Sequence, residues 1–569
     1  MPASKAVDCG DYLDCSQMHA WDIVIADEAI PSERYAAQEF QRWFSRSTGL
    51  QLPLRSAAEG TSCHVIIGAD AANLNPSAMQ EEELQISIER NRLVIAGGRP
   101  RGTLYGVYQF LEDYLGVRFL TCDHTHVPDA TELKIPCGTR TYTPPFSFRW
   151  SFYRENAAHP EFAAKLRVNT VTGEDRLGGN TCQSLINHSF HLLVPYNEYG
   201  ESDPEFYALV DGERDTRTRG GGPQLCVTNP EVVETAAAAV IKRLNDQPLA
   251  RNISVSQADT NAYCRCNACE EINGREDTPM GAQLTFVNAV AERVEKAHPD
   301  VKIGTLAYWY TRKAPITIRP RHNVQIQLCS IECCTLHPID DSKCEKNRAF
   351  CRDADEWGKI CNDIWIWNYN TNFHAYDLPF PNLRVIGPNV RYFLRNNAKG
   401  VFMQANGSST TGELCDLRNY IIARLIWDPE LDDEALCGEF VRLHYGGAAQ
   451  PILDYINRLH DNADARGLHP GCFPLPHEVG LDAEFAREIF EYFERALAMS
   501  DDDVIRARVE KASICAYRAM IATGDEIPPA ERTQLIERYI TLCQRYEMTH
   551  AAENRLASDY FEELKSSLI

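Results

Sequence analysis

The segments VQIQLCSIE (324–332), DIWIWNYN (363–370) and KGVFMQAN (399–406) decide the predicted fold. Each is a short, nearly continuous apolar run that ends in polar or aromatic residues. Strands of a parallel sheet are buried on both faces and show this pattern, whereas half-exposed strands alternate apolar and polar residues. Helical stretches such as PEVVETAAAAVIKRLND (230–246) lie between runs of this kind. The alternation predicts a barrel of parallel strands with helices outside.

Five more segments extend this pattern towards the N-terminus. They are FRWSFYR (148–154), LRVNTVT (166–172), TCQSLIN (181–187), NISVSQAD (252–259) and KIGTLAYWY (302–310). Together the eight strands predict a (β/α)8 TIM-like barrel over residues 146–428. TCQSLIN is the segment that could equally be a loop.

Different patterns flank the predicted barrel. Residues 1–142 alternate strand-like and helix-like segments, which predicts an N-terminal α/β accessory domain, and Pro144 and Pro145 then mark a linker. Residues 429–569 read as a C-terminal α-helical domain, whose last long helix is predicted to run from ERTQLIERY to THAAE at residue 553.

Composition limits the partners. The chain has 569 residues and a net charge of −23, and such an acidic surface predicts a glycan or other small-molecule substrate and no nucleic acid. The sequence contains no run of about 18 apolar residues, so no membrane span is predicted. The start of the sequence lacks a signal-peptide pattern, which favours the cytoplasm unless such a peptide was removed. The odd number of cysteines, 21, favours reduced thiols, and the oligomeric state stays open, a homo-oligomer included.

Barrel enzymes place their chemistry at the carboxyl ends of the strands. Two carboxylates there, Asp259 and Glu332, are the predicted catalytic residues, although Asp259 could instead cap a loop. Glu332 lies in the apolar and cysteine-rich CSIECC, where desolvation is expected to keep it protonated, as a general acid must be. The predicted substrate-binding residues are His188, His191, Gln257, Tyr308, Tyr310, Trp367, Asn368, Tyr369 and Gln404. Of these, Tyr369 is the expected platform for a sugar ring.

Cys264, Cys266 and Cys269 have the spacing C-x-C-x2-C, which resembles half of a zinc or iron–sulfur site. A fourth ligand would have to come from Cys333, Cys334, Cys344 or His337. The alternative is a loop of reduced thiols, so no metal and no cofactor is assigned, and any metal bound here is expected to be structural. HExxH, Walker A and GxSxG motifs are absent from the sequence.

Several longer segments resemble known families. RGTLYGVYQFLEDYLGVRFL (101–120) resembles the accessory domain shared by α-glucuronidases and β-hexosaminidases. HSFHLLVPYNEY, DPEFYALVDGER, QLCVTNPEV, SVSQADTNAYCRCNAC, IQLCSIECCTLHPI, WIWNYNTNFHAYDLPFPNL and ARLIWDPELD resemble the family known as domain of unknown function 4838. That family includes glycoside hydrolase family 163, which acts as a β-N-acetylglucosaminidase on N-glycans. The resemblance extends to about residue 460.

The resemblance implies a retaining, substrate-assisted β-N-acetylhexosaminidase acting on GlcNAc or GalNAc linkages. Glu332 would then be the acid and Asp259 would orient the substrate acetamide, although these roles could be reversed. Relatives often show Trp-Asp-Tyr where this chain has Asn368 between its aromatics. One alternative is an α-glucuronidase-like enzyme that uses Arg154, Arg312 or His191 for the uronate. The other is a glycan-binding protein without activity, which Asn368 keeps open.

Overall fold

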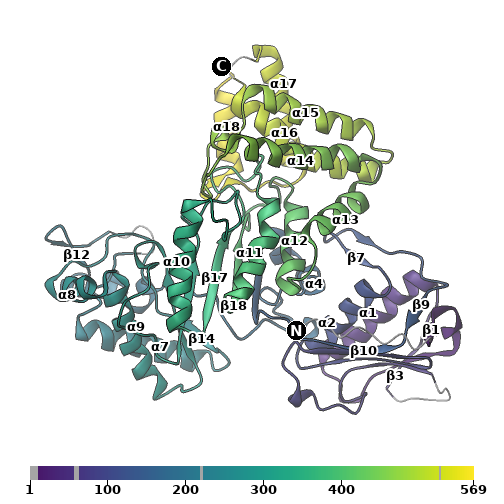
Figure 1. Cartoon of the computed structure of the whole chain (residues 1–569), viewed down its shortest axis with the longest axis horizontal. Helices are drawn as coiled ribbons and strands as arrows, with labels where there is room; N and C mark the ends of the chain where they lie inside the picture. Colours follow the sequence, from purple (N-terminus) through teal and green to yellow (C-terminus); the bar gives the residue numbers. More distant parts are fainter. Residues whose placement is uncertain (1–10, 57–62, 218–221, 525–526, 569) are drawn as a thin grey trace.

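The computed structural model describes residues 11–56, 63–217, 222–524 and 527–568. Figure 1 shows three regions: a purple and blue N-terminal sheet, a teal and green middle region, and yellow helices above it. We propose that these regions are three domains with the predicted boundaries. Among the described residues, no helix has both the length and the apolar character needed to cross a membrane.

The N-terminal region is built on a mixed six-stranded sheet. Its order is β10 (Gly138–Tyr142), β5 (Leu84–Glu89), β6 (Arg92–Gly97), β4 (His64–Ile67), β2 (Asp22–Val24) and β3 (Leu54–Arg55). Helices α1 (Pro31–Thr48) and α2 (Gly102–Asp113) pack together and against it (Figure 1). Helix α1 begins with a proline and ends before Gly49 in the left-handed conformation, as the sequence signals predict. Two small pairs, β1 (Tyr12–Asp14) with β9 (Lys134–Pro136) and β7 (Arg118–Phe119) with β8 (Thr125–His126), complete this region.

The middle region contains a six-stranded sheet in which every pair is parallel. Its order is β11 (Phe148–Phe152), β18 (Ala398–Gln404), β17 (Ile364–Tyr369), β16 (Val324–Cys329), β15 (Lys302–Ala307) and β14 (Asn252–Ser254). Six of the eight predicted strands are thus confirmed. All six residues of β16 are buried, as expected for a strand that is covered on both faces.

The other two predicted strands are wrong. Residues 166–172 and 181–187 form no strand, so the described residues contain a six-stranded parallel sheet and not the predicted eight-stranded barrel. In the first segment Arg167 has a φ of 58°, which breaks the extended backbone. The Asn169 side chain then accepts the amide hydrogen of Arg149 at 3.0 Å. In the second segment the amide of Ser184 donates to the side chain of Asn252 at 2.7 Å. In both segments, a hydrogen bond to an asparagine side chain is present where the prediction required hydrogen bonds between strand backbones.

The sheet is curled around a core of its own. Phe148 from one edge strand, Leu306 and Trp365 from inner strands and Ile186 from the second unpaired segment belong to one buried cluster. A Cβ on Gly304 would lie 2.4 Å from the Ile186 side chain, so only glycine allows this approach. Ile186 thus occupies the place of a strand residue in the interior although its backbone is not in a ladder.

Helices cover the outside of the curled sheet. They are α7 (Pro230–Asp246), α8 (Asn267–Glu276), α9 (Met280–Glu295), α10 (Glu345–Ile360), α11 (Leu383–Arg395) and α12 (Cys415–Trp427). Shorter helices are α3 (Arg154–Ala158), α4 (Pro160–Lys165), α5 (Phe190–Leu193) and α6 (Tyr196–Tyr199), and a two-stranded pair joins β12 (Leu209–Val210) to β13 (Glu213–Arg214). Figure 1 places α7, α8 and α9 at the left of the middle region, away from the N-terminal sheet.

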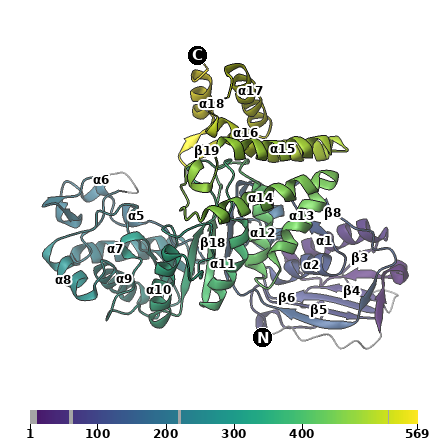
Figure 2. The same ribbon diagram turned by 45° about the horizontal axis from the view of Figure 1, so that its top comes forward.

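The C-terminal region is helical, with one exception. It contains α13 (Asp433–Tyr445), α14 (Ala449–Arg466), α15 (Ala483–Ala498), α16 (Asp503–Thr523), α17 (Pro529–Arg545) and α18 (Ala557–Ser566). The predicted continuation of α17 to residue 553 is wrong, because Glu547 has a φ of 56° and a hairpin of β19 (His550–Ala552) and β20 (Arg555–Leu556) follows. Figure 2 shows β19 directed towards the middle region, below α16. Through this hairpin, residues 550–556 reach the carboxyl end of the central sheet.

Candidate active site

Asp259 lies just beyond β14, at the carboxyl end of the sheet. The hydroxyl of Tyr308 donates a hydrogen bond to Asp259 Oδ1 at 3.1 Å, and His188 Nε2 lies 3.7 Å from the same oxygen. The His188 ring is fixed from its other side, because Nδ1 lies 2.7 Å from the carbonyl oxygen of Gln257. Half of the Asp259 side chain, 50%, is exposed. The carboxylate is therefore positioned by the protein and open to a ligand.

Glu332 follows β16 and has an ionic partner that its sequence neighbours do not reveal. Arg312, from the turn after β15, places Nη1 3.1 Å from Glu332 Oε2 and Nε 2.6 Å from Asp353. The Glu332 side chain is 35% exposed. The surroundings are thus not the apolar ones expected from CSIECC, because a guanidinium lies against the carboxyl group.

The aromatic face offered to solvent belongs to Trp309. The sequence prediction chose its neighbours Tyr308 and Tyr310, but Tyr308 is buried and Trp309 is 47% exposed. Trp309 also has a φ of 56°, which is a rare backbone conformation for a bulky residue and is costly by about 1–3 kcal/mol. Strain of this kind is concentrated at functional sites, so Trp309 is a candidate platform for a sugar ring.

Glu553 is a third carboxyl group at this end of the sheet, and the sequence prediction missed it. It lies in the turn between β19 and β20, and its backbone amide donates to the carbonyl of Phe373 at 3.1 Å. Gln404 Nε2, at the end of β18, donates to Glu553 Oε1 at 3.0 Å. Trp367 Nε1 in turn donates to Gln404 Oε1 at 2.7 Å. The two predicted binding residues Trp367 and Gln404 therefore hold Glu553 in place.

Burial raises the pKa of Glu553, the hydrogen bond from Gln404 opposes this, and the negative charge of Asp259 raises the pKa further. Burial also raises the pKa of Tyr308, and the charges of Asp259 and Glu332 both add to this effect. The charge of Asp259 thus acts on Glu553, and the charges of Asp259 and Glu332 both act on Tyr308. We call Asp259, Tyr308, Trp309, Glu332, Gln404 and Glu553 the strand-end group.

Two predicted binding residues, Asn368 and Tyr369, are buried. Asn368 is buried and donates through Nδ2 to the hydroxyl of Ser330 at 3.0 Å. Tyr369 is also buried, with its ring 6.0 Å from that of Phe373, so it is not the exposed sugar platform that the sequence suggested. Both residues support the strand ends from within.

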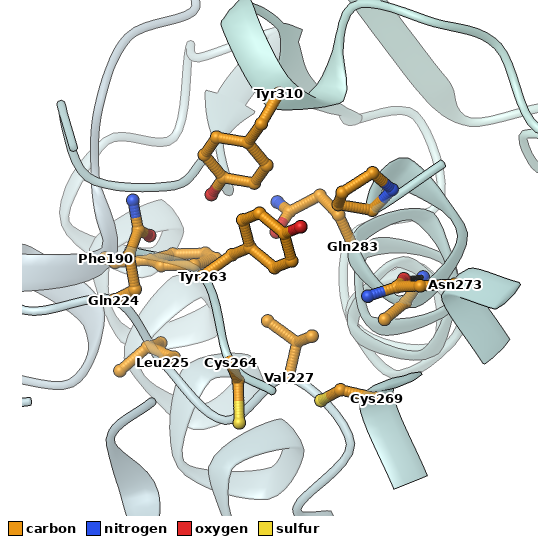
Figure 3. A pocket seen from close by; sticks show the side chains of 12 residues that line it. Phe190, Gln224, Leu225, Val227, Tyr263, Cys264, Cys269, Asn273, Gln283 and Tyr310 are labelled. Atoms are coloured by element: carbon orange, nitrogen blue, oxygen red, sulfur yellow. Dashed lines mark hydrogen bonds between the residues drawn. The ribbon is translucent and has the colours of Figure 1, made fainter. Parts of the chain in front are cut away.

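The side chains of three other predicted binding residues have other neighbours. Gln257 is completely buried and donates to Thr311 Oγ1 at 2.7 Å. Tyr310 stacks on Tyr263 at a centroid distance of 4.9 Å and lines a cavity of about 20 Å³ (Figure 3), which has room for a water molecule but not for a sugar. His191 lies exposed on α5. None of the three shares a hydrogen bond with Asp259, Glu332 or Glu553 in the described part of the chain.

Residues 119–457 match the family model described as Domain of unknown function (DUF4838). The chain belongs to this family. No protein of curated function matches the sequence. Among solved structures, the chain is similar to a GH138 enzyme targeting pectin rhamnogalacturonan II, with 10% identity and a TM-score of 0.46 over 96% of this chain and 98% of that one.

It is also similar to the chitobiase FjGH20 of Flavobacterium johnsoniae, with 13% identity and a TM-score of 0.44 over 100% of this chain and 98% of that one. Both neighbours are glycoside hydrolases. TM-scores below 0.5 do not establish a shared fold or a shared activity.

The DUF4838 region also contains the thiols noted in the sequence. Cys264, Cys266 and Cys269 converge, but the fourth thiol is Cys226, which precedes α7 and was not among the predicted candidates. The four Sγ atoms lie within 4.8 Å of one another, and those of Cys226 and Cys266 are 3.7 Å apart. In Figure 3 the sulfur atoms of Cys264 and Cys269 lie at the lower edge of the small cavity, away from Tyr310. The set can hold one metal ion. Its signal in the sequence was the cysteine of QLCVTNPEV, which lies 38 positions before Cys264.

Proposed function

We propose that this protein is a glycoside hydrolase that cleaves N-acetylhexosaminides with help from the substrate acetamide. The observation that carries the proposal is the strand-end group. Asp259, Glu332 and Glu553 come from three distant segments to the carboxyl end of the central sheet, and the exposed Trp309 follows Tyr308, which donates a hydrogen bond to Asp259. Carboxyl groups that serve as acid, base or orienting group, together with a flat aromatic face, are what glycosidic bond cleavage needs.

Asp259 and Tyr308 fit the acetamide. An ionised carboxylate can accept a hydrogen bond from the acetamide N–H, and the adjacent tyrosine hydroxyl can turn to the acetamide carbonyl. Held in this way, the carbonyl oxygen attacks the anomeric carbon while the bond to the leaving oxygen breaks. The Asp259 carboxylate stabilises the positive charge that develops on the cyclic intermediate.

Glu553 fits the general acid. It must be protonated to give its proton to the leaving oxygen, and burial together with the charge of Asp259 favours the protonated form. Afterwards its carboxylate takes a proton from the water that opens the intermediate, which restores the enzyme. Glu332 was the acid predicted from the sequence, but one of its carboxylate oxygens is engaged in an ion pair with Arg312. We therefore assign Glu332 to hydrogen bonding with sugar hydroxyls.

The two alternatives fit these surroundings less well. A uronate-binding site needs a free cation, whereas Arg312 is already shared between Glu332 and Asp353. A glycan-binding protein without activity would not need a partly buried carboxyl group whose pKa is raised by burial and by the charge of Asp259.

A panel of substrates tests the proposal. Nitrophenyl glycosides of GlcNAc, GalNAc and glucuronic acid and a complex N-glycan would be incubated with the full chain, with the Asp259→Asn variant as the inactive control. We expect turnover of an N-acetylhexosaminide and none of the glucuronide. A trifluoroacetamide in place of the acetamide should slow the reaction, because its oxygen is a weaker nucleophile. Binding of the glycan without any hydrolysis would overturn the proposal.

We also propose that Cys226, Cys264, Cys266 and Cys269 hold a structural Zn²⁺. Tetrahedral zinc with sulfur ligands at about 2.3 Å places neighbouring sulfurs about 3.8 Å apart, close to the 3.7 Å between Cys226 and Cys266. Four protein ligands leave no open position, so this ion would stabilise the loops and take no part in the reaction.

A further inference from the structure

A second group of metal-ligating side chains lies in the loop that follows Glu332. Cys334, His337 and Cys344 come from this loop, and His469 comes from the segment after α14. One ligand atom of each lies within 4.8 Å of the others. Cys334 Sγ is 3.2 Å from His337 Nδ1, and Cys344 Sγ is 3.3 Å from His469 Nδ1. The two imidazole rings are stacked with their centroids 4.2 Å apart.

These separations fit one tetrahedral ion. Zinc bonds of about 2.3 Å to sulfur and about 2.0–2.1 Å to nitrogen put a sulfur and a nitrogen ligand about 3.5 Å apart. Both observed pairs are within a few tenths of an ångström of that separation. Two thiolates and two imidazoles form a known set for structural zinc.

The protein backbone around the four ligands is held by other residues. Asn347, which is completely buried at the start of α10, accepts the amide hydrogen of Cys334 at 2.8 Å and donates to the carbonyl oxygen of His337 at 3.0 Å. Lys346 Nζ donates to the carbonyl oxygen of His469 at 2.7 Å. The amide of Thr335 donates to the carbonyl oxygen of Pro470 at 3.0 Å. The loop and the segment after α14 are therefore fixed to each other at the ligand positions, as a built site requires.

We propose that Cys334, His337, Cys344 and His469 bind a second structural Zn²⁺. The ion closes a link between the loop that begins at Glu332 and the C-terminal helices. It has four protein ligands and no open position, so its role is to fix the loop and not to activate water. This site goes beyond the proposed function and does not depend on it, because its test measures bound metal and not glycoside hydrolysis.

Metal analysis of the full chain tests the proposal. The protein would be purified without chelator and its zinc measured per chain by plasma mass spectrometry. We expect two equivalents in the unchanged protein. The double variant Cys334→Ser/Cys344→Ser should lose one equivalent, and Cys264→Ser/Cys266→Ser should lose the other. Cys351→Ser is the matched control, since this thiol lies on α10 outside the cluster and its loss should leave both ions.

Cobalt gives a measurement that does not depend on whether a variant folds. In the unchanged chain, reconstitution with Co²⁺ should give visible absorption from two tetrahedral sites, one with four sulfur ligands and one with two sulfur and two nitrogen ligands. A spectrum of the four-sulfur site alone, or one equivalent of zinc that the Cys264→Ser/Cys266→Ser variant removes completely, would overturn the second site. A disulfide between Cys334 and Cys344 in the purified protein would overturn it as well.

Discussion

The loop after β16 and the turn between β19 and β20 each bring one glutamate to the carboxyl end of the central sheet, in opposite surroundings. Glu332 meets the guanidinium of Arg312 at 3.1 Å. Glu553 is partly buried and has the charge of Asp259 nearby, and both raise its pKa, although the hydrogen bond from Gln404 opposes this. Desolvation near another carboxylate favours the protonated form that a general acid needs, whereas the carboxyl group of Glu332 is engaged by a cation.

This difference separates the two roles more clearly than sequence position does. Glu332 follows a long apolar strand, which is the usual place for a catalytic carboxylate in a barrel, and Glu553 lies about 220 residues further along in a helical region. A carboxyl group whose pKa is raised by its surroundings is a candidate for the general acid of an enzyme. The comparison therefore gives the acid role to the residue that the sequence pattern did not select.

The largest loss that should appear equally on every substrate is expected at Asp259, whose charge raises the pKa of Glu553. Asp259→Asn removes the carboxylate that faces the acetamide, so kcat/KM should fall by about 10²–10³. The loss should be equal on a natural glycan and on an activated aryl glycoside, because the change acts on the nucleophile side. Steady-state kinetics on both substrates measures it. Asp300→Asn, at an exposed position, is the matched control and should leave both rates unchanged. A loss confined to the natural glycan would place Asp259 on the leaving-group side instead.

The pH profile sharpens the difference between the glutamates. Glu553 must be protonated to act, and its pKa is raised by burial, so activity should be present at low pH and fall as the pH rises through that raised value. In Glu553→Gln this alkaline limb should disappear, because glutamine does not titrate. The plot of log kcat/KM against pH for the unchanged chain and for both glutamine variants measures this. If the limb is lost in Glu332→Gln and retained in Glu553→Gln, the assignment of the two residues is reversed.

A smaller effect is expected at Trp309, which contributes a binding face and no proton. Trp309→Ala should raise KM by about fivefold, which corresponds to about 1 kcal/mol of stacking, with little change in kcat. Trp309→Phe keeps a flat face and should restore most of the affinity. If both variants keep the KM of the unchanged chain, Trp309 is not the platform, and the strain at its backbone has another cause.

The sequence predicted those parts of the fold that depend on local pattern. Six parallel strands were identifiable because each is a short apolar run, and β16 is buried throughout as expected. The second predicted strand failed because its second residue, Arg167, has a positive φ, which no apolar pattern reveals. The third failed although its residue Ile186 does enter the core, since burial alone does not require a backbone ladder.

The site was less predictable because its contacts are distant in the sequence. Asp259 and Glu332 were selected as candidates from the strand ends, but Arg312, Cys226 and His469 become partners only through folding. Glu553 was hidden in what reads as the last turns of a helix. It would have been a candidate only if the left-handed residue Glu547 had been recognised as the end of α17.

The most direct test of the account is the dependence of rate on the leaving group. Rates of the unchanged chain, Glu553→Gln and Glu332→Gln would be measured on a series of aryl glycosides and on a natural glycan. A general acid matters most for a poor leaving group, so Glu553→Gln should lose about 10²–10⁴ in turnover on the glycan and far less on the nitrophenyl glycoside. Glu332→Gln should lose less turnover than Glu553→Gln does on the glycan, and the factor should be about the same on every substrate. If Glu332→Gln shows the steep dependence and Glu553→Gln does not, Glu332 is the acid and the central claim is wrong.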